Sequence, residues 1–140
     1  MHRLIPLVLL ALAAGCAPAQ REAAHAAAAE PMPRHLFRGE GEAPYWVVVV
    51  DEREIVLTLE SGGPGREADY RTFRYAGVRA QSAGGVRRWT AGRGTAVISV
   101  EGWTEACVLR GYDYRERARV RLSGRELNGC GGPPPVVEIR

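Results

Sequence analysis

The sequence predicts an all-β domain, a small antiparallel barrel or sandwich of about seven to eight strands with one disulfide. Short runs of β-branched and aromatic residues, such as residues 45–50, recur along the chain, and glycine-rich turns such as residues 61–65 separate them. No apolar repeat with a helical period of useful length follows residue 36. The apolar fraction is 46%, which argues against a disordered chain because these runs require burial.

The predicted strands follow one another with few residues between them. Residues 45–50 are a continuous apolar run, which predicts a strand covered on both faces. Ile55, Leu57 and Leu59 alternate with less apolar residues, which is typical of a strand buried on one face. Further strands are expected within residues 71–78, 86–91, 95–101 and 117–122, with a return strand in 126–129.

The clearest alternation lies near the end of the chain. Ala118, Val120 and Leu122 are expected on one face of a strand, and arginines on the other. Ser123 and Gly124 follow as the two central residues of a hairpin turn. Arg115, Arg117, Arg119 and Arg121 occupy alternate positions and are therefore predicted to share one face.

This arginine row is the candidate anion-binding site. Guanidinium groups suit phosphate and carboxylate, so an anionic component of the cell envelope is the expected ligand. Like charges in a row repel one another unless acids lie opposite them. The favoured alternative is therefore an outer face on which acids of a neighbouring strand, such as Glu101, pair with the arginines.

Residues 1–15 have the layout of a secretory signal peptide, with a basic start and a short apolar run. The run is too short to span a membrane. The motif Leu12-Ala13-Ala14-Gly15-Cys16 resembles the lipobox of bacterial lipoproteins. That resemblance implies cleavage before Cys16 and attachment of lipid to its sulfur, so the expected partner is a membrane.

Residues 16–36 are interpreted as the lipidated cysteine followed by a tether rich in alanine and proline, and residues 37–140 as the β domain. Cys107 and Cys130 remain in that domain. An exported domain lies in an oxidising compartment, so these two cysteines are expected to form a disulfide. A thiol or metal site is the alternative, but the domain has no Cys-x-x-Cys motif and no histidine after residue 36.

Catalysis has little support in the sequence. A Ser-His-Asp triad needs a histidine beside the serine, and the domain has none. A carboxylate pair for glycan cleavage stays open, although no two acids stand out. Asp51, Glu52 and Glu54 could hold calcium, but a solvated turn is favoured. No cofactor or metal is expected, and the mild net charge of +3 does not favour nucleic acid.

Two stretches resemble an uncharacterised family of small envelope lipoproteins. Residues 37–46 match its opening, and residues 107–130 match its close. The positions that fit are Gly41, Pro44, Tyr45, Trp46, Cys107, Tyr114, Val120, Gly124, Gly129 and Cys130. Departures occur at Glu42-Ala43 and at residues 108–111. A more distant likeness is to membrane-bound inhibitors of C-type lysozyme, whose Ser-Gly-x-x-aromatic loop is absent here.

Together these features predict a lipid-anchored cell-envelope protein, with the outer membrane facing the periplasm as the preferred location. Its β domain is expected to act by binding or structural interaction and not as an enzyme. An inhibitor of lysozyme-type hydrolases is the alternative function, and a glycan-acting enzyme is the least favoured.

Overall fold

The computed structural model describes residues 34–62 and 67–132 of the chain. Within these ranges nine antiparallel strands form one sheet: β1 (His35–Gly41), β2 (Trp46–Asp51), β3 (Glu54–Glu60), β4 (Tyr70–Ala76), β5 (Arg79–Ala83), β6 (Val86–Arg93), β7 (Ala96–Leu109), β8 (Tyr112–Leu122) and β9 (Arg125–Gly131). Their order in the sheet is β4-β3-β2-β1-β9-β8-β7-β6-β5. The all-β prediction is confirmed. No helix in the described ranges is long and apolar enough to cross a membrane.

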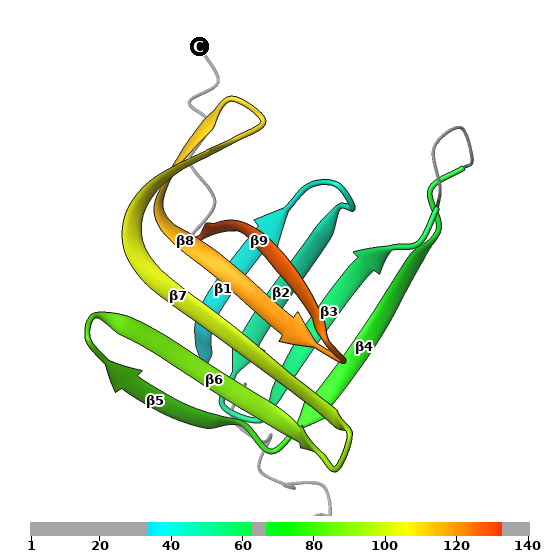
Figure 1. Cartoon of the computed structure of the whole chain (residues 1–140), viewed down its shortest axis with the longest axis vertical. Helices are drawn as coiled ribbons and strands as arrows, with labels where there is room; N and C mark the ends of the chain where they lie inside the picture. Colours follow the sequence, from blue (N-terminus) through cyan, green and yellow to red (C-terminus); the bar gives the residue numbers. More distant parts are fainter. Residues whose placement is uncertain (1–33, 63–66, 133–140) are drawn as a thin grey trace, which may run out of the picture. The chain divides into compact units, whose positions relative to one another are not determined.

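The sheet bends over itself, so that β1 to β3 lie behind β6 to β8, with β4 beside β3 (Figure 1). Strands β4 and β5 are its two edges, although only Gly77 and Val78 separate them in the chain. In the described residues no backbone pairing joins these edges, so the sheet is an open one.

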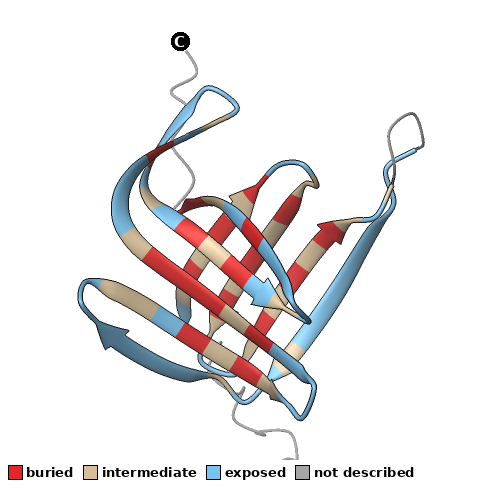
Figure 2. Cartoon of the chain, viewed as in Figure 1, coloured by how far each residue is buried: buried red, intermediate tan, exposed pale blue. Residues whose placement is uncertain are grey.

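The core lies between the two layers, as the buried bands in Figure 2 show. It contains alternate residues of the strands, because successive side chains of a strand point to opposite faces. The fully buried members include Trp46, Ile55, Leu57, Ile98 and Val120. Burial of this apolar surface is the main force that holds the two layers together.

Two aromatic rings of the core lie directly on glycines. A Cβ atom added to Gly102 or Gly131 would lie 2.6 or 2.5 Å from the Phe37 ring. The Trp46 ring lies against Gly41 and Gly129 in the same way. The Phe37 ring can lie this close to β7 and β9, and the Trp46 ring this close to β1 and β9, only because these residues have no side chain.

The hairpin of β7 and β8 is longer than the others, and its outer half curls away from the sheet (Figure 1). The strand pairing shifts between Thr104 and Cys107, where the curl occurs. Such an irregularity bends a strand pair strongly. Cys107 and Tyr114 beyond the shift, together with Cys130 of β9, form a second, smaller buried cluster, against which Leu109 packs.

Candidate functional site

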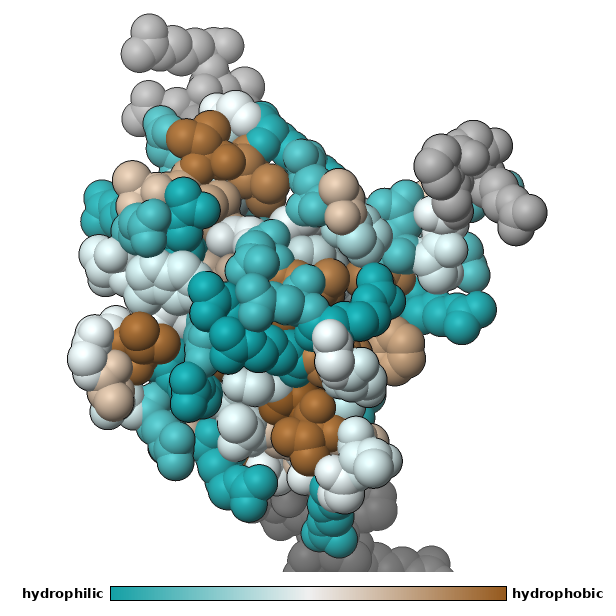
Figure 3. Space-filling model, viewed as in Figure 1, coloured by the Kyte–Doolittle hydropathy of each residue, from teal (hydrophilic) through white to brown (hydrophobic). Residues whose placement is uncertain are grey.

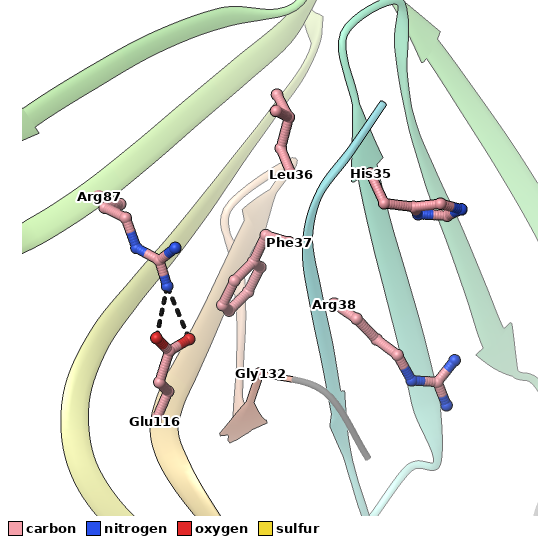
Figure 4. Close-up of a pocket in the computed structure, with 7 residues that line it drawn as sticks. All are labelled: His35, Leu36, Phe37, Arg38, Arg87, Glu116 and Gly132. Carbon is pink, nitrogen blue, oxygen red and sulfur yellow. Dashed lines mark hydrogen bonds and ion pairs between the residues drawn. The ribbon is translucent and has the colours of Figure 1, made fainter. Parts of the chain in front are cut away.

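One end of the space between the layers contains a hollow of about 360 Å³, which we call the mouth hollow (Figure 4). Arg87 belongs to the inner face of β6, because it alternates with the buried residues Trp89 and Ala91. Glu116 belongs to the inner face of β8, two residues before buried Ala118. The complete lining is His35, Leu36, Phe37, Arg38, Arg87, Glu116 and Gly132.

An irregularity in β1 supplies the apolar side of the mouth hollow. The pairing with β2 shifts between His35 and Phe37. Phe37 is buried in the core, and the preceding Leu36 packs against the same core. In Figure 4 both side chains lie on the side of Arg87 and Glu116, whereas His35 and Arg38 point to the other side of the strand.

Arg87 and Glu116 form an ion pair across the mouth hollow. The Nη2 atom of Arg87 donates to both carboxylate oxygens of Glu116, at 2.7 and 2.6 Å. The guanidinium carbon also lies 5.4 Å from the centre of the Phe37 ring and 5.3 Å from that of Trp89. These rings stack on each other at 5.0 Å. The guanidinium is therefore held between an acid and an aromatic surface.

This arrangement leaves part of Arg87 unused. A guanidinium carries five N–H donors, and Glu116 engages a single nitrogen. The Nε and Nη1 atoms have no hydrogen-bond partner among the described residues. The side chain is 40% exposed, so an anionic group that enters from solvent can bind it beside Phe37.

The curled hairpin is fastened to β1 by a tyrosine. The Tyr114 hydroxyl donates to Glu40 Oε1, and Arg38 Nη2 donates to Glu40 Oε2 at 3.0 Å. Burial raises the pKa of Tyr114 to about 12, and the adjacent Glu40 carboxylate acts in the same direction. The neutral phenol is therefore the form that the folded hairpin stabilises.

A second contact holds the hairpin tip to the turn between β1 and β2. Arg110 Nε donates to Glu42 Oε1 at 2.5 Å, and the guanidinium carbon lies 4.4 Å from the centre of the Tyr45 ring. The hydrogen bond to Glu42 raises the pKa of Arg110. Apolar side chains remain exposed at the tip, as Figure 3 shows, and Val108 is 69% exposed.

The predicted disulfide is confirmed. Cys107 and Cys130 are bonded, with their Cα atoms 5.5 Å apart, and the bond links the curled half of β7 to β9. Cys16, the predicted lipidation site, lies outside the described residues, as do the predicted signal peptide and nearly all of the tether.

The arginine row lies on the outer face of the sheet, where its side chains form ion pairs with glutamates. Glu101 of β7 is 4% exposed. Its carboxylate accepts from Arg88 at 2.5 Å, and from Arg119 and Arg121 at 3.5 Å each. The acid pairing that the sequence favoured for this face is therefore present. Figure 3 shows the hydrophilic side chains gathered over β7 to β9.

The first two arginines of the row differ from Arg119 and Arg121. Arg117 pairs with Glu105 at 2.7 Å, and hydrogen bonds from Trp103 and Arg117 hold the pKa of that carboxyl below its usual value. Arg115 is exposed, and its side chain has no partner among the described residues. Anion binding by the row stays a prediction.

The acidic turn after β2 has a structural role. Asp51 Oδ1 accepts from the backbone N–H groups of Arg53 and Glu54 at 2.7 and 2.8 Å. Partial burial opposes ionisation of Asp51, but these two hydrogen bonds lower its pKa overall. Among residues 34–62 and 67–132, no group of three or more metal-binding side chains occurs.

The mouth hollow was not predicted from the sequence, although a signal for it was present. Arg87 and Glu116 are charged residues at strand positions where the alternation calls for apolar ones. Such inward charges need a partner or a ligand. Their pairing follows from the fold, because 29 residues separate them in the chain.

The described part of the chain is thus an open antiparallel sheet with one disulfide and a charged, partly aromatic hollow at one end. No protein-family model, curated protein or solved structure matches the chain.

Proposed function

We propose that this chain is a lipoprotein of the bacterial cell envelope whose β domain binds a small amphipathic anion in the mouth hollow. The domain acts by binding and not by catalysis. It is anchored through lipid on Cys16, and the preferred location is the outer membrane, facing the periplasm. The observation that carries the binding proposal is the half-exposed Arg87, which stands over the Phe37 ring with unused donors.

Each part of this function has its own support. The motif that ends at Cys16 supports the lipid anchor. The bond between Cys107 and Cys130 fits an oxidising compartment, where disulfides persist. The mouth hollow combines apolar surface with a few convergent polar groups, which is the usual character of a ligand pocket.

The ligand class follows from the lining. An anionic group of the ligand would bind the Nε and Nη1 atoms of Arg87, where a charge-assisted hydrogen bond is strong. The apolar part would lie against Leu36 and Phe37. Glu116 disfavours a ligand with a second negative charge nearby, because it keeps one side of the hollow anionic.

Native mass spectrometry tests the binding. The full chain is extracted with a non-ionic detergent from the membranes of the bacterium that produces it. A small adduct that is released on unfolding is expected, and Arg87→Gln is expected to lose it. Arg88→Gln is the matched control, because Arg88 is the next residue but lies on the outer face, paired with Glu101. Equal adducts in both variants, or no adduct in the unaltered chain, would contradict the proposal.

Metabolic labelling with an alkyne fatty acid tests the anchor. Label is expected on the unaltered chain and on the Cys107→Ala, Cys130→Ala variant, but not on Cys16→Ala. Label that persists in Cys16→Ala would reject lipidation at this residue.

A further inference from the structure

A second hollow lies where the chain crosses from one edge of the sheet to the other. It has a volume of about 600 Å³, and we call it the corner hollow. Its lining comes from the end of β4, the start of β5 and the turn between β6 and β7. The lining residues are Arg74, Tyr75, Ala76, Gly77, Arg79, Gly92, Arg93 and Ala96.

The backbone fixes the walls of the corner hollow. The Gly77 N–H donates to the Arg53 carbonyl at 3.1 Å, which ties the crossing segment to the turn between β2 and β3. Gly92 has a φ of 101°, and a side chain there would collide with the Ala96 carbonyl. Tyr75 packs against the core below. The three arginines therefore belong to strand ends whose backbone is held in place by these contacts.

The charge of the corner hollow is unlike that of the mouth hollow and of two further hollows in the described part of the chain. The mouth hollow pairs Arg87 with Glu116, and the hollow beside the turn between β8 and β9 pairs Arg121 with Glu126. The small hollow near Trp103 pairs Arg119 with Glu101. The corner hollow has three arginines and no acid in its lining.

Only one of these three arginines is neutralised by a residue of the described ranges. Arg74 donates to Glu54 at 2.5 Å, and Glu54 is not part of the lining. The side chains of Arg79 and Arg93 are exposed, with no ion pair or hydrogen bond to any described residue. Elsewhere in the sheet arginines are commonly matched with glutamates, so two unmatched guanidinium groups in one hollow favour an anion from outside the chain.

We propose that the corner hollow binds a phosphate group through Arg79 and Arg93, with Arg74 beside them. Guanidinium forks match the geometry of phosphate oxygens. The oxygens of a phosphate group point in several directions. They can therefore accept hydrogen bonds from arginines that belong to three different strands. The source is either a phosphodiester of a lipid headgroup or a free phosphate. The site does not depend on the mouth hollow, because the two hollows share no residue.

Nuclear magnetic resonance of the arginine side chains tests this site in the full chain, held in an uncharged detergent. Inorganic phosphate is titrated at constant ionic strength. The Nε–H signals of Arg79 and Arg93 are expected to shift and saturate, and those of Arg71 and Arg125 to stay unchanged. Arg71 and Arg125 are suitable references because they are also exposed, have no side-chain partner among the described residues and lie outside the arginine row.

Paired variants separate a site from general charge attraction. The Arg79→Gln, Arg93→Gln variant is expected to bind phosphate about tenfold more weakly, since charge-assisted hydrogen bonds are lost. Arg71→Gln, Arg125→Gln removes the same net charge and is expected to change the affinity by less than about twofold, because distant exposed charges are screened.

A second titration with glycerophosphoglycerol, a soluble phosphodiester headgroup, identifies the source. Tighter binding of this compound than of inorganic phosphate assigns the site to lipid headgroups, and the reverse order assigns it to free phosphate. The proposal is overturned if neither compound shifts Arg79 and Arg93. It is also overturned if acetate shifts them equally, or if both paired variants lose affinity to the same extent.

Discussion

Close contact between aromatic rings and glycines determines how near the two layers of the sheet can lie. Phe37 of β1 fits against Gly102 of β7 and Gly131 of β9, and is only 5% exposed. An extra methyl group in a well-packed core forces side chains or backbone to move, which destabilises the fold. Packing against the Phe37 ring therefore requires glycine at these two positions, which lie within strands and not in turns.

Gly131→Ala is expected to lower the free energy of unfolding by about 2 kcal/mol, because the new methyl group overlaps the Phe37 ring. Phe37→Leu is expected to destabilise the chain by itself, but also to make room for that methyl group. The double variant is therefore expected to be more stable than the sum of the two changes predicts. Urea unfolding measures all three, and strict additivity would contradict this contact.

Glu101 is the acid that most affects the outer face, because three arginines share its buried carboxylate. Glu101→Gln is expected to lower the free energy of unfolding by about 2 kcal/mol, since charged hydrogen bonds are lost and the arginines then repel one another. Glu105→Gln, on the same strand and face but exposed, is the control and is expected to have a smaller effect. Urea unfolding that ranks the two variants in the opposite order would contradict this role of Glu101.

Tyr114 makes the attachment of the hairpin sensitive to alkaline pH. Its pKa is raised from 10.0 to about 12 in the folded chain, so its stabilising effect is complete below pH 10 and is lost as the pH rises toward 12. Ultraviolet titration should show a tyrosine that ionises late, and Tyr114→Phe should remove that step. The same late step in Tyr114→Phe would contradict the assignment.

The curled half of the hairpin of β7 and β8 is held in position by a few individual interactions. A disulfide, one tyrosine and one arginine hold its curled half against β9, β1 and the turn that follows β1. Little apolar surface supports this half, since its cluster contains only three buried residues among those described. Its local stability is therefore expected to be lower than that of the main core.

The Cys107→Ala, Cys130→Ala variant is expected to lose about 3 kcal/mol of unfolding free energy, the value for a loop of this length. Hydrogen exchange should locate the effect: amides of residues 105–115 should exchange much faster, while those of β2 and β3 should change least. Uniform acceleration over all strands, or an unchanged urea midpoint, would contradict the separate role of this hairpin.

Sequence patterns predicted the strands that have one buried face and one exposed face. In β3 and β8 one face is buried and the other is not, and the alternation was correct in both. The turn at Ser123 and Gly124 was also correct, and both residues have positive φ. The pattern failed for β5, which is exposed along its whole length and has no apolar period to detect.

Two other elements differ from their sequence patterns. The run at residues 45–50 was expected to be covered on both faces, but only Trp46, Val48 and Val50 are buried. The outer face is partly open because the other layer of the sheet covers only the inner one. Strand β7 continues to Leu109, beyond the predicted end at residue 101, since pairing with β8 maintains it through polar residues.

At the scale of the whole molecule, the candidate sites depend on how the sheet folds back. The arginine row could be predicted because its spacing lies within one strand. The acid partners of those arginines lie on β7 and β9, and which of them meet depends on strand register, which the sequence pattern does not specify. Both hollows join residues from different strands, so their lining follows from topology. The inward positions of Arg87 and Glu116 were the single usable signal.

The central claim is that the chain is an exported, lipid-anchored binding domain. Intact-mass measurement of the chain purified from its own bacterium, before and after reduction, tests it most directly. We expect a chain that begins at Cys16, carries the mass of attached acyl groups and gains two hydrogens when Cys107 and Cys130 are reduced. A chain that begins at Met1 with no added mass, or one whose two domain thiols are already free, would contradict this claim.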